Sequence, residues 1–465
     1  MQNITFNPIL DTDSYKASHF LQYPPSTTGL FAYLESRGGR FPQTLFFGLQ
    51  AILKSQLLQT ITSEHVAEAA ELFAQHGLPF AKPGFDRIVN HHQGHWPVRI
   101  RAVPEGTLVP THNVLMTVES TDPAVPWVVT YLETMILRLW YPVTVATLSF
   151  QARQIIETAL IQSADDPAFE IPFKLHDFGA RGVSSRESAM LGGLAHLVNF
   201  QGTDTVAALV AARNYYGCPM AGYSIPAAEH STMTSWGRSR ETEAYQSMLD
   251  QFAKPGAILA VVSDSYDIDH AIAHIWGKVL KSKVMESGAT IVIRVDSGDP
   301  VQQVVSALSK LDNAFGHQLN SKRFKLLNHV RVIQGDGIDL NTIQEILNTV
   351  LRAGYSASNV VFGMGGALLQ KVNRDTQKFA YKVCEATIDG IRIPIRKEPA
   401  SDKGKWSKAG RQDLIRNTNG ELQTITVPDS LDKSPESALQ TVYFNGQFRN
   451  EVTLDEIRKR ASAYS

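Results

Sequence analysis

Residues 290–337 read TIVIRVDSGDPVQQVVSALSKLDNAFGHQLNSKRFKLLNHVRVIQGDG, and this stretch decides the fold class. It starts and ends with short apolar runs, TIVIRV and VRVIQ, which have the length and β-branched content of buried strands. The residues after the first run carry an apolar stripe at three- and four-residue steps, formed by Val301, Val304, Val305, Leu308 and Leu311. That period predicts a helix. A strand, a helix and a strand in this order predict parallel pairing through a right-handed crossover.

The same alternation extends on both sides of this stretch. Seven short apolar segments are expected as strands, namely 174–178, 196–200, 222–225, 258–263, 290–295, 330–334 and 359–363. Between the last two lies a second helical stripe, and Gly354 stands where that helix should end. Strands and helices that alternate this densely fit a (β/α) barrel better than an open sheet.

The flanking segments do not continue this alternation. Residues 1–150 have a mixed α/β pattern, with an apolar stripe from Val125 to Leu139 that predicts a core-facing helix. FAYKVCEATIDGIRIPIRK, from Phe379, predicts two strands around an Asp389–Gly390 turn. We therefore expect an N-terminal α/β segment over 1–150, a barrel over 151–378 and a β-rich segment over 379–465 that packs with the first to form an α+β domain.

Composition restricts the class of protein. The chain has 465 residues, of which 43% are hydrophobic and 19% charged, as in an ordinary globular protein with a large core. A net charge of -1 argues against nucleic acid or an anionic membrane as the main partner. Two distant cysteines exclude a disulfide framework and suit a reducing compartment. The N-terminus lacks a signal-peptide pattern and no apolar run spans a membrane, so we expect a cytoplasmic protein.

Charged residues and glycines gather at the carboxyl ends of the expected strands. They are Asp177, Asp204, Glu229 with His230, Asp264 with Asp267, Arg294 with Asp296, Asp336, and the run 363–366. Active sites of (β/α) barrels are built on that one face from the βα loops. Asp and Gly are also common in ordinary loops and helix caps. A cluster at every strand end nevertheless favours a functional site.

Two features of this face indicate phosphate. Gly363-Met364-Gly365-Gly366 leaves a strand and enters a helix, so backbone N–H groups converge where an anion binds. Arg374 is expected on the same helix, and Arg181 and Arg294 lie on the same face, which suggests a ligand with more than one phosphate. The glycine run has neither the lysine of a P-loop nor the spacing of a dinucleotide fingerprint.

Other residues of this face have expected roles of their own. Asp296 and Asp267 could hold Mg²⁺ on a polyphosphate or orient His230. Asp336 offers a carboxylate to a ribose diol, and Phe178 offers a flat face to an aromatic ring. His91, His92 and His95 lack an acidic or cysteine partner at ligand spacing, so a solvated loop is expected there instead of a metal site.

Seven motifs in order resemble the nicotinamide phosphoribosyltransferase family of type II phosphoribosyltransferases. They are HDFGARGVSS (176–185), GTDT (202–205), GYSIPAAEHS (222–231), SDSYD (263–267), RVDSGDP (294–300), RVIQGDG (331–337) and GMGGALLQKVNRD (363–375). The resemblance extends from DTDSYK at 11–16 to DEIRK at 455–459. It implies an enzyme that joins nicotinamide to phosphoribosyl pyrophosphate, giving nicotinamide mononucleotide and pyrophosphate. It also implies a homodimer with active sites at the subunit interface, Mg²⁺ as cofactor, and ATP as co-substrate.

The resemblance assigns the residues of the reaction centre. It implies that ATP phosphorylates His230, that Asp267 orients this histidine, and that Asp296 is catalytic. It places the nicotinamide ring between Phe178 and Tyr15 of a second subunit. The carboxamide would donate to Asp204, whose charge would repel nicotinate.

The resemblance also implies the remaining ligand contacts. The expected substrate-binding residues further include Ser224, Arg294, Gly335, Asp336, Gly365, Gly366 and Arg374. The expected phosphate-binding residues are Arg181, His230, Arg294, Lys382, Lys397 and Lys405, the last in a basic loop that would otherwise be a solvated surface. Ala180 departs from the aromatic residue that animal members often have, which leaves the detailed pocket wall undefined.

Three alternatives remain open on the sequence. Nicotinate phosphoribosyltransferase shares the fold and mechanism, but Asp204 argues against it. A hydrolase would use Ser263 or Ser265 with His230 and Asp267, but no G-x-S-x-G elbow is present. A non-enzymatic protein on a decayed barrel should have lost some of the charged cluster, which is complete.

Overall fold

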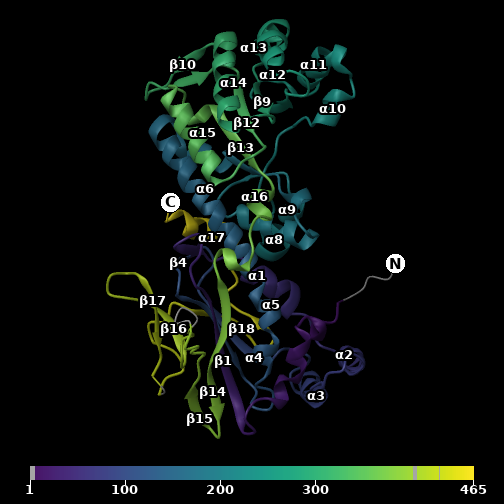
Figure 1. Cartoon of the computed structure of the whole chain (residues 1–465), viewed down its shortest axis with the longest axis vertical. Helices are drawn as coiled ribbons and strands as arrows, with labels where there is room; N and C mark the ends of the chain where they lie inside the picture. The colour runs from purple at the N-terminus through teal and green to yellow at the C-terminus, as the bar shows by residue number, and fades with distance from the viewer. Residues whose placement is uncertain (1–5, 402–405, 429, 465) are drawn as a thin grey trace. The chain divides into compact units, whose positions relative to one another are not determined.

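The computed structural model describes residues 6–401, 406–428 and 430–464, and these form two compact units (Figure 1). The first unit contains residues 1–147, 214–218 and 373–464, so both ends of the chain contribute to it. The second contains residues 148–213 and 219–372. Helices α6 (Trp140–Ser163) and α9 (Val206–Tyr216) each contribute residues to both units.

The first unit is built on a seven-stranded antiparallel sheet. Its strand order is β15-β14-β1-β5-β3-β18-β19. The bounds are β1 (Thr27–Ser36), β3 (Val98–Ala102), β5 (Val114–Ser120), β14 (Phe379–Ile388), β15 (Ile391–Pro394), β18 (Gln440–Phe444) and β19 (Gln447–Phe448). Two separate pairs are β2 (Gln43–Leu45) with β4 (Leu108–Pro110) and β16 (Gln412–Arg416) with β17 (Leu422–Thr426).

The predicted C-terminal hairpin is confirmed. Strands β14 and β15 pair antiparallel with Ile388 opposite Ile391, which leaves Asp389 and Gly390 as a two-residue turn. Both turn residues have positive φ, 51° and 76°, as such a turn requires. The longest register in this sheet joins β14 to β1, and Figure 1 shows these two strands side by side. Residues from the two ends of the chain are therefore hydrogen-bonded neighbours.

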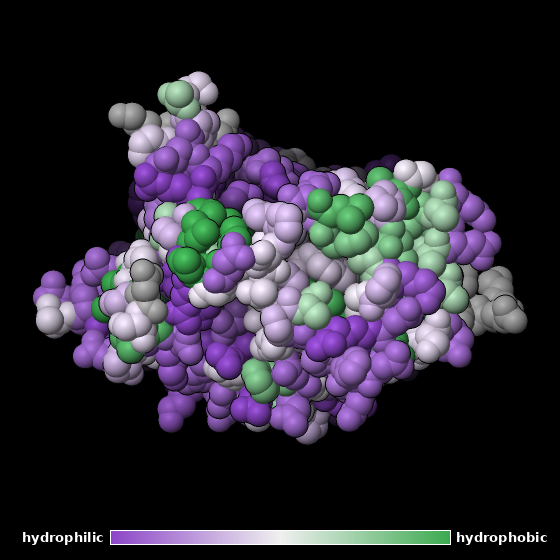
Figure 2. Space-filling model, turned by 90° about the horizontal axis from the view of Figure 1, so that it is seen from below, coloured by the Kyte–Doolittle hydropathy of each residue, from purple (hydrophilic) through white to green (hydrophobic). Residues whose placement is uncertain are grey.

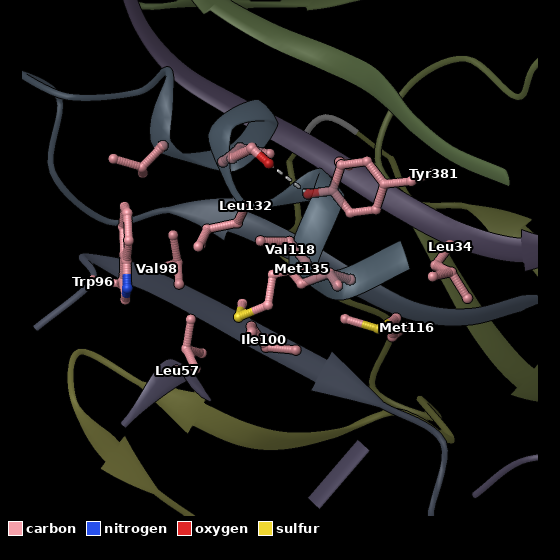
Figure 3. Packing of buried hydrophobic residues seen from close by; sticks show 14 of the residues in the cluster. Leu34, Leu57, Trp96, Val98, Ile100, Met116, Val118, Leu132, Met135 and Tyr381 are labelled. Carbon is pink, nitrogen blue, oxygen red and sulfur yellow. Dashed lines mark hydrogen bonds between the residues drawn. The ribbon is translucent and has the colours of Figure 1, made fainter. Parts of the chain in front are cut away.

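Helices cover this sheet and bury a large apolar core. They are α1 (Leu49–Ile52), α2 (Ser63–Gln75), α3 (Lys82–His91), α4 (Val128–Tyr131), α5 (Glu133–Leu137) and α17 (Leu454–Ser462). Figure 3 shows Leu132 and Met135 packed with strand residues such as Val98 and Ile100. The Tyr381 hydroxyl donates to the Val129 carbonyl at 2.8 Å, which satisfies both polar groups inside the core (Figure 3).

The apolar stripe from Val125 to Leu139 is buried as predicted, but it is not one helix. The chain forms α4 and α5 with a break at Leu132, whose N–H bonds back to Thr130 and Val128. The period of the buried stripe therefore located the face that packs on the core but not the break between the two helices.

The surface differs in composition from the apolar core. Figure 2 shows a face on which hydrophilic residues predominate and hydrophobic residues form small separate patches.

The second unit is built on a six-stranded parallel sheet. Its strand order is β7-β6-β13-β12-β9-β8. The bounds are β6 (Leu175–Asp177), β7 (Gly202–Thr203), β8 (Ile258–Val262), β9 (Thr290–Val295), β12 (Val330–Gln334) and β13 (Val360–Met364). Each of these is paired in parallel with its neighbours. The two edge strands are also linked, because Tyr223 bridges Gly202 in β7 and Ala227 bridges Ala260 in β8.

This arrangement confirms the α/β fold with a barrel-like parallel core, and it corrects two of the seven expected strands. Residues 196–200 are not a strand, because α8 (Arg186–His196) extends to His196 and the chain then turns. Residues 222–225 are irregular, with a single bridge from Tyr223 to β7, and the bridge to β8 comes from Ala227 further along the chain. Both segments have apolar strand-like composition, but neither has a neighbour along its whole length with which to form a ladder.

Helices alternate with the strands of this sheet as predicted. Their bounds are α7 (Pro167–Glu170), α10 (His230–Thr234), α11 (Glu241–Phe252), α12 (Ile268–His270), α13 (Lys281–Ser287), α14 (Pro300–Phe315), α15 (Leu340–Arg352) and α16 (Gly366–Leu369). A short antiparallel pair, β10 (His317–Leu319) with β11 (Lys325–Leu327), follows α14. Asp299 caps α14 and Asp339 caps α15, each by accepting from backbone N–H groups. Among the described residues, no helix has the length and apolar character needed to cross a membrane.

Candidate active site

A cavity of about 210 Å³ lies in the parallel-sheet unit. Its lining comes from the segments that follow β6 and β7, from the 222–228 segment, and from β8, β9 and β12. The lining residues are Phe178, Ala180, Arg181, Asp204, Thr205, Ala227, Ala260, Arg294 and Ile333. Four of these, Phe178, Arg181, Asp204 and Arg294, were predicted as site residues, so the fold brings the main predicted side chains to one cavity.

Phe178 forms an aromatic wall of the cavity, and glycines make room for it. A Cβ atom at position 363 would lie 2.1 Å from the Phe178 ring, so β13 must carry glycine at that point. A Cβ at Gly335 would meet the same ring at 3.6 Å. The Phe178 N–H donates to the Met364 carbonyl at 3.0 Å, and the Arg294 guanidinium lies 6.0 Å from the ring centre. The ring is therefore held through its backbone and lies against Gly363 of β13 and Gly335 after β12.

Asp204 is the carboxylate of the cavity. The Ser224 hydroxyl donates to its Oδ1 at 2.6 Å, which links two residues that were predicted to bind the same substrate. The Asp204 N–H donates to the Asp177 carbonyl at 3.0 Å, so the loop after β7 is fixed to the end of β6. Asp204 therefore presents a negative charge at a defined place in the cavity wall.

Asp177 supports this wall from inside the protein. Its side chain is fully buried, and its Oδ1 accepts from the Gly179 N–H at 2.7 Å. A Cβ at Gly193 in α8 would lie 2.9 Å from its Oδ2, so that glycine provides space for the carboxyl. Burial raises the pKa of Asp177 to about 6, and the charge of Asp204 acts in the same direction.

Arg294 and Asp296 form an ion pair at the end of β9. The Arg294 Nη2 donates to Asp296 Oδ2 at 2.6 Å. The Arg294 Nε and the Asp296 Oδ1 are buried and have no hydrogen-bond partner within the described parts of the chain. A Cβ at Gly335 would lie 3.0 Å from that Oδ1, so the glycine leaves space beside it. Buried polar atoms without partners are the groups expected to receive a ligand.

His230 begins helix α10, and about half of its side chain is exposed to solvent. Its side chain is 47% exposed, and its Nε2 lies 3.0 Å from Oδ1 of Asp264, whose side chain is 3% exposed. Glu229 forms the capping box of α10 with Thr232. The hydroxyls that follow His230 bond to nearby carbonyls and to Glu229, so they shape this short helix instead of extending the reactive group.

The predicted partner of His230 was wrong. Asp267 does not contact the histidine, because it caps α12 and accepts from the His270 N–H at 3.0 Å. That bond lowers the pKa of Asp267. Asp264 contacts the histidine instead, and it lies two residues beyond the end of β8. The sequence contained Asp264 among the strand-end residues, but both carboxylates fitted the same pattern.

The predicted passage from a strand into a helix at 363–366 is confirmed, and the predicted length of that helix is corrected. Gly365 and Gly366 follow β13, and Gly366 begins α16. A Cβ at Gly182 would lie 3.8 Å from Gly366, so the turn that carries Arg181 is adjacent. Helix α16 ends at Leu369, however, and Arg374 begins a separate 3-10 turn. The prediction that Arg374 continues the same helix was therefore wrong.

Several predicted residues lie outside the lining of this cavity. Asp336 is exposed in the turn after β12, where its carbonyl accepts from the Gln334 side chain at 2.8 Å. Tyr15, Lys382 and Lys397 belong to the antiparallel-sheet unit. Tyr15 is 56% exposed, with the Lys16 ammonium 5.2 Å from its ring centre.

Lys382 and Lys397 differ in their surroundings. Lys382 lies in β14 and donates to the Tyr381 carbonyl at 2.8 Å. Burial lowers its pKa, and the nearby cations Arg37 and Lys397 act in the same direction. Lys397 is exposed, and its N–H donates to the Ser407 hydroxyl at 2.9 Å. Lys405 lies outside the described residues.

Sequence reasoning did not single out Thr205, Ala227, Ala260 or Ile333 as part of the cavity. Ala260 and Ile333 pack in one small apolar cluster with Val292 inside the sheet. Each lies in a predicted strand, so the alternation of side chains between the two faces of that strand could have identified it. Ala227 lies in the irregular 222–228 segment, for which no such period exists.

Two family comparisons match most of the chain. Residues 173–447 match the nicotinate phosphoribosyltransferase (NAPRTase) family. Residues 7–100 match the N-terminal domain of nicotinamide phosphoribosyltransferase. The chain is 57% identical over 460 residues to a nicotinamide phosphoribosyltransferase of Xanthomonas campestris pv. campestris, covering 98% of both chains. It is 30% identical over 494 residues to one of Acinetobacter baylyi, covering 98% and 97% of the two chains.

Solved structures share the fold at low sequence identity. A nicotinate-nucleotide pyrophosphorylase from Pyrococcus furiosus superposes with a TM-score of 0.61 at 16% identity, over 100% of this chain and 98% of that one. Human nicotinic acid phosphoribosyltransferase superposes with a TM-score of 0.55 at 18% identity, over 97% and 93%. At this level of identity, these two structures support the fold of a type II phosphoribosyltransferase.

Proposed function

Because the chain belongs to the nicotinamide phosphoribosyltransferase family, we propose that nicotinamide binds in the cavity between Phe178 and Asp204 and that ATP stimulates the reaction through His230. The enzyme is a pentosyltransferase of NAD salvage. It joins nicotinamide to 5-phosphoribosyl 1-pyrophosphate and forms nicotinamide mononucleotide and pyrophosphate. The pyridine nitrogen bonds to C1′ of the ribose as the C1′–O bond to pyrophosphate breaks.

The base site is supported by the chemistry of its walls. Phe178 offers a fixed aromatic face for the pyridine ring, and Asp204 offers an acceptor for the carboxamide NH₂. A nicotinate carboxylate in the same place would face the Asp204 charge without a proton to donate. The single observation that carries this assignment is the hydrogen bond of 2.6 Å from Ser224, which holds the Asp204 carboxylate at the cavity.

The pyrophosphate end is supported by cations and by accessible polar atoms. Arg181 and Arg294 line the same cavity, and Arg294 Nε has a free donor direction. Gly365 and Gly366 expose backbone N–H groups near the Arg181 turn, where the 5′-phosphate would bind. Cations at this end stabilise the charge that develops on the departing pyrophosphate. We further propose that Gly335 and Asp336 bind the ribose, that Arg374 binds the 5′-phosphate, and that the diphosphate and phosphate groups are bound by Lys382, Lys397 and Lys405.

Mg²⁺ fits this site as a partner of the pyrophosphate. The Asp296 Oδ1 is a buried carboxylate oxygen that accepts no hydrogen bond from any described residue, and carboxylate oxygen is the ligand that Mg²⁺ prefers. The described residues contain no group of three or more His, Cys, Asp or Glu side chains that could hold a metal ion, so the remaining ligands would be phosphate oxygens and water. When bound, Mg²⁺ would neutralise charge on the pyrophosphate.

The ATP-dependent step is supported by the contact between His230 and Asp264. A carboxylate that accepts from Nε2–H fixes the tautomer in which Nδ1 carries the lone pair. The Nδ1 atom would then attack the γ-phosphorus of ATP, forming an N–P bond as the bond to ADP breaks. The half-exposed position of His230 gives a nucleotide access to it.

A homodimer is supported by exposed apolar side chains on both units. Tyr15 is exposed on the first unit, and Val206, Val210 and Tyr223 are 69%, 50% and 53% exposed on the second. Val206 directly follows the loop that carries Asp204. Apolar surface beside a substrate site is suited to burial by a second subunit, which would bring its own Tyr15 to the base.

The decisive experiment compares nicotinamide with nicotinate, with and without ATP. We expect product from nicotinamide, a higher rate with ATP, and much lower turnover of nicotinate. Asp264→Asn should abolish the ATP effect as His230→Ala does, because both remove the oriented nucleophile. Asp267→Asn is the matched control and should retain the ATP effect. Equal turnover of both bases would instead favour nicotinate phosphoribosyltransferase, whose family matches residues 173–447.

A further inference from the structure

Asp264 has different partners on its two carboxylate oxygens. Oδ1 lies 3.0 Å from His230 Nε2. Oδ2 accepts from the Asp296 N–H at 3.2 Å and from the Ser297 hydroxyl. The side chain is 3% exposed, so water does not replace these donors. One buried carboxylate therefore joins the histidine to the turn that follows β9.

The end of β9 and the turn that follows it carry the Arg294–Asp296 pair, and Arg294 lines the cavity. Asp296 accepts from Arg294 at 2.6 Å, and the Arg294 guanidinium lies over the Phe178 ring. Arg294 Nε and Asp296 Oδ1 are the buried atoms without partners described above. A continuous series of contacts thus leads from His230 through Asp264 and the 294–297 turn to the residues proposed to hold substrate.

We propose that Ser297 is a positioning residue that couples the state of His230 to the Arg294–Asp296 pair by holding the Asp264 carboxylate against the turn. This inference rests on the proposed function, because it requires ATP to act at His230. The hydroxyl and the Asp296 N–H are the two donors on Oδ2, and the hydroxyl is the one that a substitution removes. No role for Ser297 follows from substrate contact, since it is absent from the cavity lining.

The physical argument concerns what happens when charge is added beside Asp264. A phosphoryl group on Nδ1 places negative charge near the Asp264 carboxylate, and the two repel. A carboxylate fixed at Oδ2 cannot turn away without moving the 294–297 turn, so the repulsion reaches Asp296 and Arg294. Without the Ser297 hydroxyl, only the Asp296 N–H, at 3.2 Å, holds Oδ2, so the carboxylate turns more readily about its own side-chain bond and the turn responds less. Coupling energies between sites are typically 1–3 kcal/mol, which corresponds to about 5- to 150-fold in affinity.

The test is the effect of ATP on the KM for nicotinamide in Ser297→Ala. We expect the ratio of KM values without and with ATP to fall at least about fivefold relative to the wild type. Acid-labile phosphate on the protein, measured with γ-labelled ATP, should still form. Ser297→Thr keeps a hydroxyl and should retain most of the wild-type ratio. Ser235→Ala is the matched control, because the Ser235 hydroxyl bonds to the Ser231 carbonyl at 2.7 Å and not to Asp264.

Each outcome distinguishes a different claim. A wild-type KM ratio retained in Ser297→Ala contradicts the coupling and leaves the proposed function intact. Loss of phosphohistidine in Ser297→Ala also contradicts it. The serine would then be needed to form the phosphohistidine and not to couple it to the Arg294–Asp296 pair. A wild-type enzyme without any ATP effect contradicts the proposed role of ATP itself. A melting temperature within the wild-type range shows that the variant has kept its fold.

Discussion

At the scale of single residues, the charge on Asp204 is the feature with the clearest functional consequence. We expect Asp204→Asn to raise the ratio of kcat/KM for nicotinate to that for nicotinamide by about tenfold or more. Facing like charges cost several kcal/mol in a confined site, and the amide removes one of them. Steady-state kinetics with both bases measures the ratio.

Ser224→Ala is the control for that prediction. It retains the Asp204 charge and removes the hydrogen bond of 2.6 Å that orients it. We expect a rise of about three- to tenfold in the KM for nicotinamide, since one such bond contributes about 1 kcal/mol, and a smaller change in the base ratio. An unchanged ratio in Asp204→Asn would show that another residue selects the base.

The two aspartates after β8 show what a residue pattern leaves undetermined. Asp264 and Asp267 are three residues apart and both follow the same strand. Whether either meets His230 depends on where the chain leaves the strand and where α12 begins. Asp267 has the extended backbone of an N-cap, with φ -155° and ψ 101°, so its carboxylate is used by the helix. Whether an aspartate caps the helix or contacts His230 is decided by the local backbone, and the spacing of the two aspartates in the sequence does not predict it.

At the scale of elements, β13 determines how close Phe178 lies to the sheet. We expect Gly363→Ala to raise the KM for nicotinamide by about tenfold or more, because the added methyl would lie 2.1 Å from the ring and must displace it. The kcat with saturating nicotinamide should change less if the ring positions the base without taking part in bond formation. Steady-state kinetics separates the two effects.

The control for this prediction is Gly182→Ala. Its methyl would make ordinary contacts at 3.8 and 3.9 Å with Gly366, and the residue does not have positive φ. We therefore expect a small effect on the KM for nicotinamide. Equal effects of the two substitutions would show that glycine at 363 serves the backbone and not the ring.

The strands of the parallel sheet could be predicted because each is a short β-branched run followed by polar residues. Residues 258–262, 290–295, 330–334 and 360–364 form strands within one or two residues of the expected ranges. Residues 196–200 and 222–225 have similar composition, but whether they form strands depends on whether a neighbouring strand is available to hydrogen-bond with them in the folded unit. The prediction that Arg374 lies on α16 was wrong for a related reason. Helix α16 ends after four residues, although the helical pattern of the sequence continues beyond it.

At the scale of the whole molecule, the sequence predicted that the N-terminal and C-terminal segments form one domain outside the barrel. The first unit contains both segments. The sequence did not predict that residues 214–218 belong there too. The reason is a buried polar contact, since the Tyr216 hydroxyl donates to Glu105 Oε2 at 2.8 Å. The two partners are 111 positions apart, and nothing in either local sequence indicates the other.

The stability of the second unit should depend on the ionisation of Asp177. Its pKa is raised from 3.8 to about 6 by burial, so the folded state binds the proton more tightly than the unfolded state. The resulting stabilisation is complete below about pH 4 and is lost as the pH rises through about 6, a change of about 3 kcal/mol. Asp177→Asn keeps the shape and removes this dependence.

The measurement is thermal unfolding of both proteins at pH 5 and pH 8. We expect the wild type to lose more stability than Asp177→Asn between these values, with the difference confined to the transition of the parallel-sheet unit. Asp122→Asn gives a contrasting control in the other unit, where Arg87 and His92 outweigh burial and lower the pKa of Asp122 to about 2. The same pH dependence in the wild type and Asp177→Asn would refute the assignment.

The proposed dimer can be tested by distributing two defects over two subunits. If Tyr15 serves the partner's site, a heterodimer of Tyr15→Ala and His230→Ala chains has both defects in one site and none in the other. With differently tagged chains and ATP present, such a heterodimer should have about half the wild-type activity, because a two-fold dimer has two equivalent sites. Each homodimer has one defect in every site and should be less active. If Tyr15 instead serves its own subunit, both sites of the heterodimer are impaired, and its activity does not exceed the mean of the two homodimers.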